Sequence, residues 1–166
     1  MSIRVYKDGA WVTVSGKNTS NDNDSLVTRT AFTHNFTTTS TSREAFNITN
    51  TALKTYTLYN ITVSGPCWLT IYVSDTTRTA DMTNRVVTNT DWTFPVPVSD
   101  PRPGDGVVAE IVKLSGSTEE FRLSPPSIGW NDNPSPVGEM YVALANFNHD
   151  TSSTFTVSFQ VLPMES

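Results

Sequence analysis

Residues that could do nucleophilic, acid–base or metal chemistry are few in this sequence, and their spacing does not favour it. His34 and His149 are the only histidines, and neither has another His or Cys at zinc-ligand spacing, so we expect solvated or hydrogen-bonded imidazoles. Cys67 is the only cysteine, which excludes a disulfide within the chain, and its apolar neighbours predict a buried side chain. No Gly-x-Ser-x-Gly segment is present to carry a nucleophilic serine.

Other short motifs have structural interpretations that are stronger than their catalytic ones. Gly104-Asp105-Gly106 is an isolated glycine pair and predicts a turn, not a phosphate-binding loop. Residues 22–24 have two carboxylates but lack the Gly and the distal Glu of a calcium-binding loop. Four glutamates could supply the facing carboxylates of a glycoside hydrolase, although their spacing does not indicate it: Glu110, Glu119, Glu120 and Glu139. The sequence therefore predicts no enzyme, no metal site and no cofactor.

Three aromatic residues lie in or beside predicted loops instead of alternating strands. They are Trp92, Phe94 and Trp130. A loop aromatic commonly closes over its own core, and that is the first interpretation. The second is that these side chains anchor a contact, because large stiff aromatics dominate protein interfaces and stack on sugar rings.

The composition indicates strands that present a weakly charged surface. Only 16% of the residues are charged, against roughly 25% in ordinary soluble domains. Roughly one residue in six is Thr, whose branched Cβ suits a pleated, half-buried surface. The net charge is −5, and no stripe of Lys or Arg could follow a phosphate backbone. Nucleic acid and anionic membranes are therefore disfavoured as partners, and no apolar stretch is long enough to span a bilayer.

The N-terminal residues predict a separate hairpin. Two β-prone runs between Val5 and Val14 are joined by Asp8-Gly9, a pair that favours the type I′ hairpin turn. Residues 15–25 contain no apolar side chain and predict a polar linker or loop. A lone hairpin is marginal in water, so we expect residues 1–14 to be an arm that docks on another surface.

The rest of the chain predicts a succession of short strands. We expect them at Val27–Phe36, Ala45–Thr49, Lys54–Val63, Cys67–Val73, Val107–Leu114, Glu119–Leu123, Met140–Ala145 and Ser153–Val161. Residues 74–84 predict a short helix or turn with Asp75 as its N-cap. The turn signals between residues 114 and 119, and between 145 and 153, predict two hairpins, whereas residues 94–106 and 124–138 are Pro-rich and predict edges or loops.

These elements predict an all-β fold. The number and spacing of the strands favour an antiparallel β-sandwich of jelly-roll or Greek-key type, with an N-terminal β-hairpin arm. The predicted organisation is an arm at residues 1–14, a linker or loop at 15–25 and a β-sandwich domain at 26–166.

Several segments carry a resemblance to a known class of proteins. They are Gly65–Ser74, Arg78–Asp81 with Arg85, Pro101–Val107, Leu123–Pro126, the terminal strand Phe155–Leu162 and the opening Ile3–Val12. These segments resemble domains of small virion proteins and of head or tail fibre proteins of tailed bacteriophages, including phages of cyanobacteria. The resemblance covers residues 1–14 and about 53–162, and its motifs are moderately specific.

The resemblance implies a non-enzymatic virion structural protein. Its expected role is that of a capsid decoration (cement) protein, or a head or tail accessory protein, that binds major capsid or tail subunits. Such proteins commonly form symmetric homo-oligomers, for example trimers. With no signal peptide at its start, the chain is expected to be made in the host cytoplasm and to reside in the virion. The candidate partner-contact residues are Tyr6, Trp11, Trp92, Phe94, Arg102 and Trp130.

A second function stays open. The chain could be a tail-fibre or carbohydrate-binding module that recognises host surface glycans, with Trp92 and Trp130 stacking on sugar rings. The chain is short and has no coiled-coil or repetitive shaft, which favours decoration over a complete fibre. A glycoside hydrolase is the least favoured alternative.

Overall fold

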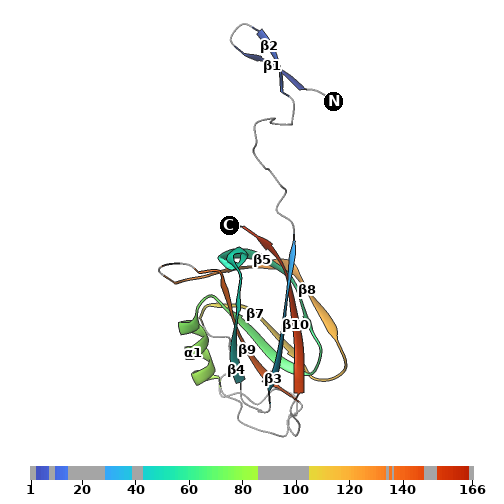
Figure 1. Cartoon of the computed structure of the whole chain (residues 1–166), viewed down its shortest axis with the longest axis vertical. Coiled ribbons are helices and arrows are strands. Elements are labelled where there is room, and N and C mark those ends of the chain that lie inside the picture. Colours follow the sequence, from blue (N-terminus) through green and yellow to red (C-terminus); the bar gives the residue numbers. More distant parts are fainter. Residues whose placement is uncertain are drawn as a thin grey trace.

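The computed structural model describes residues 3–7, 10–14, 29–38, 43–85, 105–133, 135, 137–147 and 153–164, with backbone alone for the first two ranges. Eight strands form two four-stranded sheets (Figure 1). Sheet I has the order β3-β10-β5-β8, and its strands are Thr30–Thr38, Ser153–Pro163, Thr55–Val63 and Glu119–Trp130. Sheet II has the order β4-β9-β6-β7, and its strands are Arg43–Thr49, Glu139–Asn146, Cys67–Tyr72 and Val107–Lys113.

The strand order is that of a jelly roll. The antiparallel pairs are nested along the chain, from β3 with β10 and β4 with β9 to β5 with β8 and β6 with β7. Successive strands alternate between the sheets, except for β6 and β7, which form the innermost pair and both belong to sheet II. An eight-stranded sandwich with this double Greek-key order is a jelly roll. The predicted all-β sandwich is therefore confirmed.

The core lies between the sheets and follows the period-2 pattern of the sequence. In β10, Phe155, Val157, Phe159 and Val161 are buried, as their alternation with polar residues predicts. Strand β6 is buried on both faces: Cys67, Leu69 and Ile71 face the core, whereas Trp68, Thr70 and Tyr72 lie on the outer face of sheet II. The predicted central position of this strand and the predicted burial of Cys67 are confirmed.

A short helix, α1 (Asp75–Asn84), lies against the outer face of sheet II beside β9 and β6 (Figure 1). The predicted N-cap is wrong by one residue, because the hydroxyl of Ser74 accepts the hydrogen bond from the Thr77 N–H at 3.2 Å. A single 3₁₀ turn, η1 (Thr51–Leu53), connects β4 to β5 and is capped by Asn50.

Both predicted hairpins within the sandwich are wrong. Strand β7 pairs with β6 in sheet II, whereas β8 pairs with β5 in sheet I. Likewise, β9 pairs with β4 and β6, and β10 pairs with β3 and β5. Each turn carries the chain from one sheet to the other, since all four strands bury a face in the shared core and find their partners far away in the sequence.

The predicted Pro-rich loop at residues 124–138 is also partly a strand. Strand β8 extends through Pro125 and Pro126 to Trp130. It tolerates prolines because it is the edge of sheet I and lacks a second neighbour that would need their N–H groups. The other predicted Pro-rich segment, residues 94–106, lies almost entirely outside the described residues.

The N-terminal residues form the predicted hairpin. Strands β1 (Ile3–Lys7) and β2 (Ala10–Val14) pair antiparallel with Tyr6 opposite Trp11, and they make a two-stranded sheet of their own. The Asp8-Gly9 turn and the predicted linker at 15–25 lie outside the described residues. Within the described part of the chain, no helix is long and apolar enough to cross a membrane.

Candidate functional site

The structure describes the side chain of one predicted contact residue, Trp130. This residue ends β8 and is 47% exposed, so the interpretation that it closes over its own core is wrong. Tyr6 and Trp11 face each other across the β1–β2 ladder, but their side chains lie outside the description. Trp92, Phe94 and Arg102 fall wholly outside the described residues.

Trp130 belongs to an apolar patch on the outer face of sheet I. Residues opposite each other in a ladder share a face, so Ile128, Thr57 and Leu162 form one row across three strands. In the next row Trp130 lies opposite Thr55, and the N–H of Met164 donates to the Thr55 carbonyl at 2.8 Å. Ile128 and Met164 are more than half exposed. We call Ile128, Trp130, Leu162 and Met164 the end patch.

A polar hollow of about 540 Å³ lies next along the same face. It is lined by Arg29, Tyr59, Asn60, Glu120, Arg122, Leu123, Ser124 and Gln160. The Asn60 amide donates to Glu120 Oε1 at 2.8 Å and to Gln160 Oε1 at 3.1 Å. The outer face of sheet I thus combines an apolar end with a polar, partly cationic centre.

The most tightly bonded charges of the described chain lie on the opposite side, under α1. Asp81, on α1, accepts hydrogen bonds from Arg85 Nε at 2.7 Å, from Arg43 Nη1 at 2.9 Å and from the Tyr72 hydroxyl at 2.6 Å. Arg85 also pairs with Glu110 at 2.7 Å. The Arg43 guanidinium stacks 4.0 Å above the Trp68 ring. We call Arg43, Tyr72, Asp81, Arg85 and Glu110 the Asp81 cluster.

Burial and hydrogen bonding act in opposite directions on the Asp81 cluster. Burial by itself would raise the pKa of Asp81, but hydrogen bonds from Arg85, Tyr72 and Arg43 outweigh it and lower the pKa to about 2. Burial raises the pKa of Tyr72 to about 12, with Arg43 opposing the rise. Asp81 is therefore ionised, and Tyr72 neutral, at any physiological pH.

The Asp81 cluster is a structural feature and not an open site. The side chains of Arg43, Asp81 and Arg85 are at most 2% exposed, so a solute cannot reach them without displacing α1. Within the helix itself, Arg78 donates to the carbonyl of Phe46 at 2.8 Å. These bonds attach α1 to strands of sheet II, and sequence reasoning missed all of them. The i, i+4 spacing of Asp81 and Arg85 is the signal that could have indicated one of the pairs.

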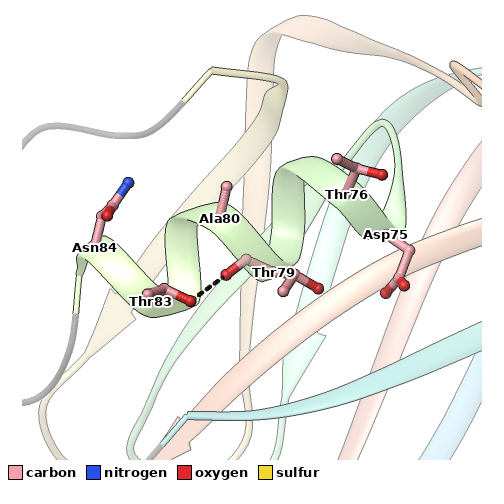
Figure 2. Close-up of a pocket in the computed structure, with 6 residues that line it drawn as sticks. All are labelled: Asp75, Thr76, Thr79, Ala80, Thr83 and Asn84. Carbon is pink, nitrogen blue, oxygen red and sulfur yellow. Dashed lines mark hydrogen bonds between the residues drawn. The ribbon is translucent and has the colours of Figure 1, made fainter.

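The exposed face of α1 forms a second, shallow hollow (Figure 2). It is lined by Asp75, Thr76, Thr79, Ala80, Thr83 and Asn84. The Thr83 hydroxyl donates to the Thr79 carbonyl at 2.8 Å, within the helix itself. A face of small, solvated side chains such as this one has no group that selects a ligand.

The four glutamates considered as a catalytic pair are dispersed. Glu110 joins the Asp81 cluster, and Glu120 lies on the far side of the sandwich in the polar hollow. Glu119 pairs with Lys113 at 3.2 Å, and Glu139 accepts from the Tyr141 hydroxyl at 2.7 Å.

The described residues contain no group of three or more His, Cys, Asp and Glu placed to hold a metal ion. His34 stacks on Phe46 with ring centroids 4.8 Å apart, and His149 lies outside the described residues. No protein-family model matches this chain, and no curated protein matches it either. Any functional assignment therefore depends on its own fold and surfaces.

Proposed function

We propose that this protein is a structural component of a bacteriophage virion, a capsid decoration or head or tail accessory protein without catalytic activity. The observation that carries the proposal is the end patch, an apolar surface on an exposed sheet beside the edge strand β8. The fold supports it by analogy, because jelly rolls are common in viral capsid domains, although they also occur in lectins and cupins.

The end patch has the character of a binding surface. Apolar patches of a few hundred Å² on a soluble domain often mark contact sites, and a central Trp is the commonest energetic anchor. Ile128 and Met164 are already nearly half buried, so covering the rest of either side chain contributes roughly 1–1.5 kcal/mol, about half the value for full burial. The occupant we propose is another virion subunit, either a shell or tail protein or a second copy of this chain.

The end patch alone is too small for a stable interface, which buries about 800 Å² on each partner. The β1–β2 hairpin can supply the remaining area. Tyr6 lies opposite Trp11 in its ladder. An isolated two-stranded sheet is only marginally stable in water, so it gains stability by packing on another surface. In the proposed assembly the hairpin of one chain docks on a neighbouring subunit, and a symmetric oligomer such as a trimer repeats this contact.

The proposal is tested with virions of the phage that encodes this chain. The purified protein is expected to form an oligomer and to sediment with these particles. Trp130→Ala is expected to weaken particle binding by at least about thirtyfold, because truncating a hot-spot Trp costs 2 kcal/mol or more. Leu114→Ala, at the residue that follows β7, removes an equally exposed apolar side chain and serves as the matched control. A monomer that does not sediment with particles would refute the proposal.

A carbohydrate-binding module is the second candidate, and the polar hollow favours it. This hypothesis assigns sugar stacking to Trp92 and Trp130. A glycan-array signal that is lost in Trp92→Ala or Trp130→Ala, from a protein that stays monomeric, would support it over the virion role.

A further inference from the structure

The polar hollow exists because β5 contains one residue that has no partner in either neighbouring strand. Leu58 pairs with Val161 and Ser127, whereas Asn60 pairs with Gln160 and Arg122, so Tyr59 is skipped by both neighbouring strands. This β-bulge turns two consecutive side chains, Tyr59 and Asn60, toward the outer face. The buried residues on either side, Leu58 and Ile61, keep their place in the core.

Strand β8 widens the same point from the other side. Between Arg122 and Ser127, four residues of β8 oppose the single residue Tyr59, and they are Leu123, Ser124, Pro125 and Pro126. Proline has no N–H to give to a ladder, so the pairing of β8 with β5 is interrupted at these four residues and resumes at Ser127. The bulge in β5 and the two prolines of β8 together open a recess in an otherwise continuous face of the sheet.

The recess presents an arginine that is oriented by one hydrogen bond and whose two terminal nitrogens stay available. Arg122 donates through Nε to Glu120 Oε1 at 2.9 Å, and Asn60 holds the same oxygen at 2.8 Å. The two terminal nitrogens of Arg122 have no partner among the described residues, and its side chain is 82% exposed. Such a planar pair of donors matches a carboxylate, which accepts both bonds at once.

The remaining lining adds a second cation, a ring and hydroxyl-binding groups. The guanidinium of Arg29 lies 4.0 Å above the Tyr59 ring, which keeps that charge at the edge of the hollow. Hydrogen bonds from Arg122 and Asn60 lower the pKa of Glu120, so this carboxylate stays ionised and paired. The amides of Asn60 and Gln160 and the hydroxyl of Ser124 can each donate and accept hydrogen bonds.

We propose that the polar hollow binds a carboxylate-bearing saccharide, namely a uronic acid unit of an acidic polysaccharide. Arg122 holds the carboxylate through its terminal nitrogens, and Arg29 adds a second positive charge. Asn60, Gln160 and Ser124 bond the ring hydroxyls. This binding site is independent of the virion assignment and requires neither Trp130 nor the end patch.

Other ligand classes fit the hollow less well. A small apolar molecule needs a mostly apolar, enclosed pocket, whereas this one is lined largely by charged and amide side chains. A nucleic acid needs a run of cations along its phosphate backbone, whereas the hollow has two, Arg29 and Arg122. One sugar carboxylate flanked by hydroxyls matches two arginines and three neutral polar groups.

The test titrates the full-length protein with oligomers of galacturonate, glucuronate and mannuronate, and with the methyl ester of each. Calorimetry gives the affinities, and ¹H–¹⁵N NMR identifies the amides that shift. At least one acid is expected to bind, with shifts centred on residues 59–60 and 120–124, and its methyl ester is expected to bind at least about tenfold more weakly, as loss of a charge-assisted hydrogen-bond pair implies.

Matched variants then test whether binding depends on the polar hollow. Arg122→Ala is expected to weaken binding of the acid at least about tenfold, whereas Arg122→Lys, which keeps the charge but not the planar donor pair, should lose less. Leu114→Ala, which lies outside both the polar hollow and the end patch, should bind the acid like the wild type. The proposal is overturned if no uronate oligomer binds, if the methyl ester binds as well as the acid, or if Arg122→Ala leaves the affinity unchanged.

Discussion

At the scale of single residues, the strongest local interactions of the described chain serve the fold. Asp81 balances Arg43 and Arg85, and all three side chains are almost completely buried. A buried ion pair adds little compared with a well-packed apolar replacement, but removing one partner leaves an uncompensated charge. The Asp81 cluster therefore attaches α1 to sheet II by a set of bonds that cannot be broken one at a time without a large penalty.

The substitution Asp81→Asn tests this dependence. It keeps the shape of the side chain but removes the charge, and we expect the free energy of unfolding to fall by about 3–5 kcal/mol in urea titrations. Asp75→Asn is the control on the same helix, because Asp75 is 62% exposed and pairs only with Arg78 among the described residues. Its expected cost is less than about 1 kcal/mol. Equal losses in the two variants would contradict the role given to Asp81.

The depressed pKa of Asp81 also predicts acid sensitivity. A carboxyl with a folded-state pKa of about 2, against an ordinary value of 3.8, contributes stability that is complete above about pH 5 and is lost as the pH falls toward 2. The contribution of this one group is about 2 kcal/mol. Urea titrations between pH 6 and pH 2 should show this loss in the wild type, and the slope should be shallower in Asp81→Asn.

At the scale of elements, the sequence predicts where strands are but not which strands pair. The alternation in β10 is clear enough to assign both its faces, and a run such as 67–72 indicates a central strand. A polar turn such as Ser115–Ser117 shows only that the chain reverses. Its sequence is the same whether the turn joins two strands of one sheet or strands of two different sheets. Pairing in a jelly roll is decided by distant partners, which is why the predicted hairpins failed.

The candidate sites were harder to predict for the same reason. Arg43 and Asp81 meet across 38 residues, and the polar hollow depends on a bulge at Tyr59 that a continuous alternating pattern does not indicate. The exposure of Trp130 could not be inferred either, because the sequence alone left open whether it covered the core or a partner.

One contact between elements gives a direct test of the β9 end of sheet II. The N–H of Asn50 donates to the Gly138 carbonyl at 2.7 Å, and a Cβ on Gly138 would lie 2.0 Å from the Asn50 carbonyl oxygen. An alanine at position 138 can fit only if the backbone moves. We therefore expect Gly138→Ala to lower the free energy of unfolding by about 1–3 kcal/mol. Val137→Ala, at the neighbouring half-exposed position, should change it by less than about 0.5 kcal/mol. If Gly138→Ala and Val137→Ala had the same midpoint of thermal unfolding, the close contact at Gly138 would be contradicted.

At the scale of the whole molecule, the hairpin and the sandwich have separate hydrogen-bond ladders. Strand β1 pairs with β2, and all eight strands of sheets I and II pair within those sheets. The sandwich therefore has its own core and its own complete set of strand partners.

A chain shortened to residues 29–166 is expected to fold. Its circular dichroism should retain the β-sheet signal, and its free energy of unfolding should lie within about 1 kcal/mol of the full-length value, because no ladder is cut. In the proposed virion role, the shortened protein should lose particle binding while remaining folded. A shortened chain without cooperative unfolding would show instead that the first 28 residues are part of the sandwich fold.

The two ends of β8 lie at opposite ends of the sandwich, and a label attached near one end should behave differently from a label attached near the other. Trp130 closes the strand beside Thr55, whereas its first residue, Glu119, lies opposite Val63 at the far end of β5. The exposed turn Ser115–Ser117 thus emerges away from Met164 and its apolar neighbours. In the proposed virion role, a fluorescent label or peptide epitope grafted into that turn would remain visible on an assembled particle and leave docking intact. The same label fused after Met164 would obstruct the end patch, a difference that sedimentation of the two fusions with particles would reveal.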